Sequence, residues 1–190
     1  MKSLKLCIFL IIVLTGCIQN SSQIFYQLVN ENFLQFVDTS AYKSGRLIQI
    51  PHDSSTKSNF DKICISVDTS VSKSIKLKEF ISTYVKDTAI KDFETILINK
   101  SEVAINSIDL SAINCSGKFI LTKSTDQQWY PKCNVIAGKI TFHQPYIAHN
   151  KAIIILSISE SLKAGYTNAF LFRKQKGIWE RIKTIEIERW

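Results

Sequence analysis

The segment AIIILSIS at residues 152–159, together with the two strand-like segments that follow it, decides the fold. Residues 152–159 are at first apolar on both sides of an extended chain, as expected of a central, well-covered strand. YTNAFLFRK (166–174) follows Gly165, and after a tight turn at residues 174–177 the segment IWERIKTIEIERW (178–190) returns. Strands in direct succession, joined by short turns, predict an antiparallel meander.

The strand pattern begins upstream of this meander. KFILTK (118–123) and GKITFHQP (138–145) are predicted strands, and Pro145 ends the second one because proline cannot donate a ladder hydrogen bond. Shorter strands are predicted at residues 47–50 and 62–67. In the last strand the alternation slips between Trp179 and Ile185, which predicts a bulge near residues 181–184.

Two segments have the apolar spacing of amphipathic helices, at residues 23–37 and 76–86. Their apolar positions recur at three- and four-residue steps: Phe25, Leu28, Val29, Phe33, Phe36 and Val37 in the first, and Leu77, Phe80, Ile81, Tyr84 and Val85 in the second. Residues 92–100 are compatible with either a helical turn or a strand. We therefore predict an α+β fold, in which a curved antiparallel β-sheet, mostly a C-terminal meander of about five to seven strands, is covered on one face by the two helices.

The first 17 residues, MKSLKLCIFLIIVLTGC, have the features of an export signal. Lys2 and Lys5 form a positive start, residues 6–14 form an apolar run, and small residues close it. A transmembrane helix is not predicted, because spanning a bilayer takes about 20 apolar residues and this run has about half that length.

The closing LTGC at residues 14–17 resembles the lipobox of bacterial lipoproteins at all four positions. The resemblance implies cleavage between Gly16 and Cys17 and a diacylglyceryl group on the Cys17 sulfur. Residues 1–16 would then be the signal peptide, 17–22 the lipid anchor with a short tether, and 23–190 a single globular domain. The alternative is an ordinary signal peptide in which Cys17 is incidental. Ile18 stands where an aspartate marks inner-membrane retention in some bacteria, which favours the outer membrane.

The body of the chain resembles small uncharacterised bacterial lipoproteins. The similarity is carried by ITFxxP at residues 140–145, by KAIIILSIS at 151–159 and by GYTNAFLFRKQKGIW at 165–179. These motifs are structural, so the resemblance implies the closing sheet of that family and supplies no activity that could be carried over to this chain.

The composition is that of a globular protein, with 45% hydrophobic and 21% charged residues. Removing residues 1–16 takes away Lys2 and Lys5, so the formal charge falls from +8 to +6. The basic residues are spread along the chain and mixed with acids, so nucleic-acid binding is not predicted. Beside anionic headgroups each basic side chain adds about 1 kcal/mol of attraction, which would draw a tethered domain toward its membrane.

Three cysteines follow the signal and the anchor: Cys64, Cys115 and Cys133. An exported protein meets an oxidising environment, and Cys115–Cys133 is the preferred pair because both cysteines lie beside turn-rich segments. Three unpaired cysteines are the alternative. Cys64 is expected on the more polar face of its strand, and the absence of a CxxC spacing gives no support for zinc.

The sequence offers little support for a catalytic site. Neither a nucleotide-binding loop nor a zinc-protease or serine-hydrolase motif occurs. The histidines are His52, His143 and His149, and Ser157, Ser159 and Ser161 alternate along one predicted strand. Nothing in the sequence ties a histidine to these serines, so we expect a polar strand face, with no metal and no cofactor beyond the lipid.

We therefore predict a lipid-anchored protein of the bacterial cell envelope that is non-enzymatic and binds another envelope component or serves structurally. Trp129 and Tyr130, in a polar loop, are the candidate interface residues. The first alternative is a small-ligand binder with an apolar pocket between the sheet and the helices. The second is an envelope hydrolase, which requires His143 or His149 within hydrogen-bond reach of a serine and an acid.

Overall fold

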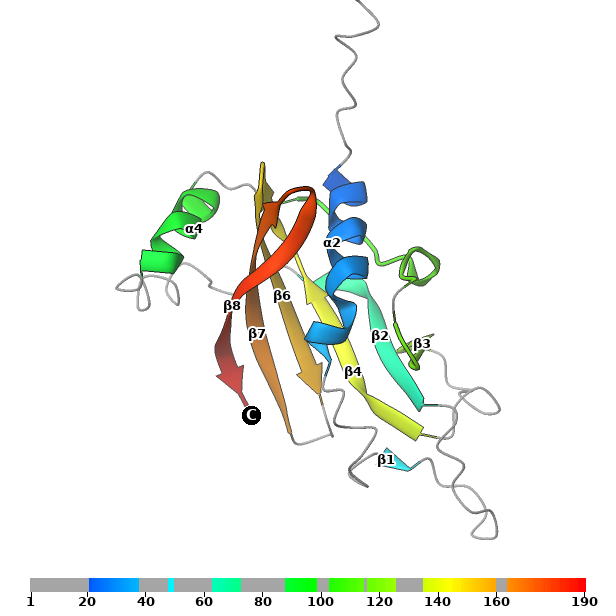
Figure 1. Cartoon of the computed structure of the whole chain (residues 1–190). Coiled ribbons are helices and arrows are strands. Elements are labelled where there is room, and N and C mark those ends of the chain that lie inside the picture. Colours follow the sequence, from blue (N-terminus) through cyan, green and yellow to red (C-terminus); the bar gives the residue numbers. More distant parts are fainter. Residues whose placement is uncertain are drawn as a thin grey trace, which may run out of the picture.

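The protein is described by a computed structural model, drawn as a cartoon in Figure 1. The described part contains one eight-stranded sheet and two α-helices. None of the helices in this part is long and apolar enough to cross a membrane. The structure describes residues 21–37, 48–49, 63–72, 88–98, 103–114, 116–125, 135–159 and 164–190.

The sheet has the strand order β3-β2-β4-β6-β7-β8, with β1 added to β4 and β5 added to β6. The strands are β1 (Ile48–Gln49), β2 (Ile63–Ser72), β3 (Ile120–Lys123), β4 (Val135–His143), β5 (Tyr146–Ala148), β6 (Lys151–Ser159), β7 (Gly165–Gln175) and β8 (Ile178–Arg189). The strands predicted from the sequence are all present, and β5 is an additional short strand that the sequence did not reveal. The predicted α+β class, with most of the sheet in the C-terminal part, is confirmed.

The sheet is mixed, whereas an antiparallel sheet was predicted. β6, β7 and β8 do form an antiparallel meander, but β2 pairs in parallel with both β3 and β4. A parallel neighbour requires a crossover connection of a dozen residues or more, and the long stretch between β2 and β3 provides one. The predicted curvature is also wrong, since the sheet is not curled.

The β7–β8 hairpin has the turn and the bulge that its sequence predicts. Lys176 and Gly177 occupy the turn with φ of 50° and 88°, as in the two-residue turns that match strand twist. Leu171 lies opposite Lys183 and Phe172 opposite Arg181. The remaining β8 residue, Ile182, is the extra residue of a bulge, at the predicted position.

Helix α2 (Ser21–Phe36) confirms the first predicted helix and packs on one face of the sheet. Its buried side chains contact strands β4 and β7 through edge-to-face rings. The ring centroids are 5.7 Å apart for Phe25 and Phe142, and 5.0 Å apart for Phe36 and Phe170. One buried residue of α2 is polar: Asn32 donates hydrogen bonds to the carbonyl oxygens of Leu28 and Trp179.

Helix α4 (Thr88–Ile98) packs on the opposite face, so the ambiguous segment at 92–100 is helical up to residue 98. The two faces can be read from β6: Ile154 and Leu156 contact the cluster under α2, whereas Ile153 and Ile155 contact the one under α4. The helix predicted at residues 76–86 lies outside the described residues.

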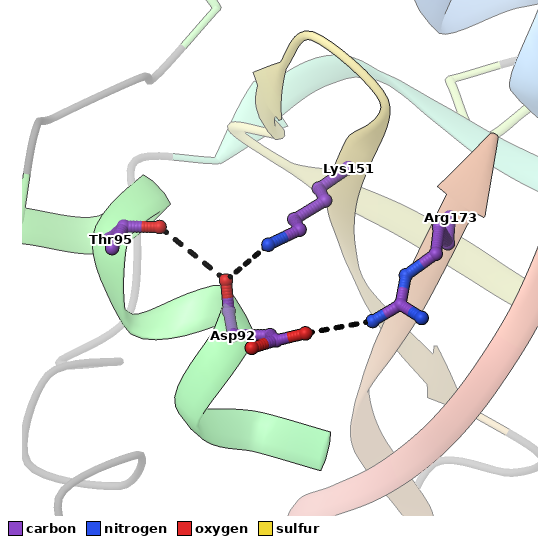
Figure 2. A network of polar contacts seen from close by, with 4 residues as sticks. All are labelled: Asp92, Thr95, Lys151 and Arg173. Carbon is purple, nitrogen blue, oxygen red and sulfur yellow. Dashed lines mark hydrogen bonds and ion pairs between the residues drawn. The ribbon is translucent and has the colours of Figure 1, made fainter. Parts of the chain in front are cut away.

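Polar contacts of Asp92 attach α4 to β6 and β7 (Figure 2). Arg173 Nη2 lies 3.0 Å from Asp92 Oδ2, and Lys151 Nζ donates to the main-chain oxygen of Asp92 at 2.9 Å. Thr95 Oγ1 donates to the same oxygen at 3.4 Å. The helix is therefore held to the strand ends by side chains from both neighbouring strands.

The segment at residues 103–113 is tied to the sheet by Gln144, in the break between β4 and β5. The Gln144 side chain accepts a hydrogen bond from the Ile105 N–H at 3.1 Å and donates one to the Ile105 oxygen at 2.9 Å. Val103 N donates to the Pro145 oxygen, and Ile108 N donates to the Thr69 oxygen. The side-chain amide of Gln144 thus makes the two hydrogen bonds to Ile105 that a neighbouring strand would otherwise make. The short 3₁₀ helix η2 (Leu110–Ala112) follows this segment.

Candidate functional site

Polar residues line the middle of the face that α4 covers in part. The strand register places Asp68 of β2 opposite Thr141 of β4, Thr141 opposite Ser157 of β6, and Ser157 opposite Thr167 of β7. Residues opposite each other in neighbouring strands point to the same side of a sheet. We call the following set the polar strip: Ser66, Asp68, Lys139, Thr141, His143, Ser157 and Thr167.

A chain of hydrogen bonds runs through the middle of the polar strip. His143 Nε2 lies 2.8 Å from Ser157 Oγ, which in turn lies 2.8 Å from Thr167 Oγ1. His143 is only 7% exposed and Thr167 only 1%. The pairing of β4 with β6 therefore brings together a histidine and a serine that the sequence analysis singled out but had no reason to connect.

Asp68 forms the charged part of the polar strip together with Lys139. Its Oδ2 lies 3.6 Å from Lys139 Nζ, and its Oδ1 accepts hydrogen bonds from the N–H and the hydroxyl of Ser70. Burial acts to raise the pKa of Asp68, but the Ser70 hydrogen bonds and the Lys139 charge outweigh it and hold the pKa below its ordinary value of 3.8. Asp68 is therefore held as a carboxylate in the folded protein.

The chemistry available to the strip is limited by its internal pairing. A serine nucleophile needs a base, a group that orients the base, and donors for the developing oxyanion. His143 is in place as a base for Ser157, but both oxygens of Asp68 are engaged by Lys139 and Ser70. With His143 and Thr167 buried, the geometry fits a hydrogen-bonded structural network better than an open catalytic site.

The other histidine of the predicted pair lies apart from this network. His149 is exposed in the turn between β5 and β6, with φ of 50°. Among the described residues there is no group of three or more His, Cys, Asp or Glu that could hold a metal ion.

Most residues singled out from the sequence lie outside the described residues. These are Gly16, Cys17, His52, Cys115, Trp129, Tyr130 and Cys133. The predicted cleavage site, lipid attachment and interface loop therefore remain predictions. Of the three tryptophans, Trp179 is buried in the α2-side cluster, whereas Trp190 is partly exposed at the end of β8.

Cys64 lies on the predicted face of its strand, but it is not the free thiol that the preferred disulfide pair would have left. Its side chain shares a face of β2 with Ser66 and Asp68, as predicted, and is fully buried there. Cys64 forms a disulfide, whereas the preferred Cys115–Cys133 pair would have left it as a free thiol. Its partner lies outside the described residues, as do both cysteines of the preferred Cys115–Cys133 pair, which stays a prediction.

Comparison with known proteins adds no relative to this description. No family model, no curated protein and no solved structure matches the chain. The function is therefore inferred from the residues and their geometry.

Proposed function

We propose that this chain is a lipoprotein of the bacterial cell envelope, anchored through a diacylglyceryl group on Cys17, whose domain has a non-enzymatic binding or structural role. The proposal is supported mainly by the short distance in sequence between the LTGC motif and the first helix of the domain. The first described element, α2, starts at Ser21, four residues after the last residue of the lipobox-like LTGC. A lipid on Cys17 would therefore hold the domain directly at the membrane surface.

The packing of α2 supports this role. Phe25, Leu28, Phe33 and Phe36 are almost completely buried against the sheet, so the helix next to the anchor is part of the domain core. Two acyl chains give stable anchoring, since each buried methylene contributes about 0.8 kcal/mol. Because α2 is packed against the sheet, a lipid just before this helix would also hold the sheet close to the membrane.

Intact mass measurement of the protein from its native bacterial host tests the proposal. The expected mass lacks residues 1–16 and includes a diacylglyceryl thioether on Cys17. A Cys17→Ser variant from the same host is the control and should lack the lipid mass. A chain that retains Met1, or one processed elsewhere with an unmodified Cys17, contradicts the proposal.

Membrane fractionation tests the location. The proposal places the lipidated protein in the outer membrane, because Ile18 follows the anchor. An Ile18→Asp variant should shift toward the inner membrane if the host sorts lipoproteins by this position. Affinity capture of the lipidated protein from its own membranes would then identify an envelope partner, with Trp129 and Tyr130 as the first residues to substitute.

A small-ligand binder remains the first alternative. It requires an apolar cavity between the sheet and a helix. On the α2 side the ring contacts of Phe25 with Phe142, and of Phe36 with Phe170 and Phe172, fill the interface, which weighs against a pocket there.

A second candidate function is an envelope hydrolase, which the contact between His143 and Ser157 favours. A fluorophosphonate probe, which reacts with activated serine hydroxyls, distinguishes the hydrolase from the non-enzymatic role. Labelling of Ser157 that is lost in both Ser157→Ala and His143→Gln would favour the hydrolase. If no labelling is seen under conditions that label a known serine hydrolase, the non-enzymatic role is supported.

A further inference from the structure

Helix α2 and strand β8 run side by side in the same direction (Figure 1). Three hydrogen-bonded pairs mark this alignment: Gln27 with Gly177, Glu31 with Trp179, and Gln35 with Arg181. Ser21 precedes Gln27 by six residues, which at 1.5 Å per helical residue is about 9 Å. The start of α2 thus projects beyond the β7–β8 turn, at the same end of the sheet.

Four basic residues of β6, β7 and the β7–β8 turn lie at this end of the sheet, together with the acidic Glu31 of α2, Asp92 of α4 and Glu180 of β8. The stretches 144–159 and 164–178, which include β5, β6 and β7, contain four basic residues and no acidic one. All four are near the β5–β6 turn or the β7–β8 turn, namely Lys151, Arg173, Lys174 and Lys176. Lys174 N donates to the Asn150 oxygen, so the two turns are adjacent.

Three of these four charges have no carboxylate partner among the described residues. Arg173 is paired with Asp92, and Glu180 lies opposite it in β8. Lys151 Nζ instead donates to a main-chain oxygen and lies 5.9 Å from the Phe93 ring centroid. Lys174 Nζ donates to Gln27 Oε1 and lies 5.6 Å from the Trp179 ring centroid, and Lys176 is exposed in the turn. These direct partners orient the ammonium groups without neutralising them, and the nearest carboxylate to Lys174 in this network, that of Glu31, is reached only through Gln27.

An exposed apolar side chain lies beside these lysines. Ile178, the first residue of β8, is 58% exposed, the highest value among the exposed large hydrophobic residues of the described part. A cationic surface with one protruding apolar side chain is suited to a membrane interface, where the ammonium groups meet phosphates and the apolar group enters the headgroup boundary.

We infer that this basic end, defined as Lys151, Lys174, Lys176 and Ile178, docks on a membrane surface that contains anionic lipids. The inference rests on the proposed function, because the lipid on Cys17 is what would bring this end of the sheet to the membrane. Between Cys17 and Ser21 only residues 18–20 remain, which span at most about 10 Å when extended. A lipid at Cys17 would thus hold the basic end, and not the opposite end of the sheet, near the headgroups.

Lysine footprinting of the lipidated protein on vesicles tests the inference. The protein is reconstituted on phosphatidylcholine vesicles with or without phosphatidylglycerol, and its lysines are acetylated and quantified by mass spectrometry. Lys151, Lys174 and Lys176 should be protected only when phosphatidylglycerol is present, and high salt should remove the protection by screening. Lys118 and Lys123, which are exposed and lie just before and at the end of the edge strand β3, should react equally in all samples.

A matched pair of variants sharpens the test. Lys176→Gln removes one charge from the turn before β8, and Lys118→Gln removes one from the turn at residues 117–118. Since each lysine near an anionic surface adds attraction, Lys176→Gln should weaken docking about fivefold, read from the protection of Lys174. Lys118→Gln should leave it unchanged. Equal effects of the two variants, or protection of Lys118 and Lys123 instead, would overturn the inference.

Flotation with the phosphatidylcholine vesicles separates this inference from the proposed function. A protein that floats there but shows no selective protection with phosphatidylglycerol retains the anchor and refutes docking. A protein that does not float on neutral vesicles, but whose basic end is protected on anionic ones, refutes the anchor and supports docking.

Discussion

The two faces of the sheet are built on different principles. The face under α2 is a continuous apolar layer in which phenylalanine rings from the helix meet those from the strands. The opposite face is divided between a smaller, mainly aliphatic cluster under α4 and the polar strip, of which Ser66, His143 and Thr167 are buried. Burial of apolar area therefore stabilises the first face, whereas the second also depends on satisfying polar groups that have left water.

The comparison is tested most strongly by Phe36→Ala on the α2 face. Phe36 is 2% exposed and contacts the rings of Phe170 and Phe172, so its truncation leaves a cavity. The free energy of unfolding should fall by about 3–5 kcal/mol, measured by chemical denaturation.

Leu34→Ala, on the same helix but 43% exposed, is the control and should change stability by no more than about 0.5 kcal/mol. Similar losses in the two variants would show that α2 does not pack on the sheet in this way.

Ser157→Ala tests the polar strip on the opposite face. Removing the hydroxyl takes one hydrogen bond each from His143 and Thr167, so the free energy of unfolding should fall by about 1–3 kcal/mol. Ser159→Ala, two residues along the same strand, should cost less than about 0.5 kcal/mol. If both serine variants are neutral, the hydrogen bonds of Ser157 to His143 and Thr167 contribute nothing to stability.

The smallest effect is expected at the charged part of the strip, and it should depend on pH. The pKa of Asp68 is lower in the folded protein than its ordinary value of 3.8, so its contribution is fully present above pH 3.8 and is lost as the pH falls through the folded pKa. At pH 7, Asp68→Asn should reduce stability by less than about 1 kcal/mol, since the ion pair is partly exposed.

Denaturation at a series of pH values checks this prediction. The difference between Asp68→Asn and the parent should disappear in acid. A difference that grows as the pH falls would mean that the sign of the pKa shift is wrong.

The sequence was most informative where structure depends on neighbouring residues. The first helix, the meander from residue 151 to the end, the turn at Lys176 and Gly177 and the bulge at Ile182 were all predicted from local spacing. Asn32 shows the limit of this reasoning. A polar residue in a helix is normally expected to be exposed to solvent. Asn32 can be buried because the fold places the main-chain oxygen of Trp179, which is distant in the sequence, within hydrogen-bond reach of its side chain.

The sequence by itself determined the α+β class and the position of most strands, because apolar periodicity and turn chemistry act over a few residues. The export signal with its lipobox-like ending is also read from the sequence alone and stays a prediction. Only the tertiary structure decided that β2 runs parallel to its neighbours and that α4 covers the second face. It also brought His143 to Ser157, and Gln27 of α2 to Lys174 and Gly177 at the β7–β8 turn. These relations join residues far apart in the chain or on different strands, and no local pattern encodes which distant segments become neighbours.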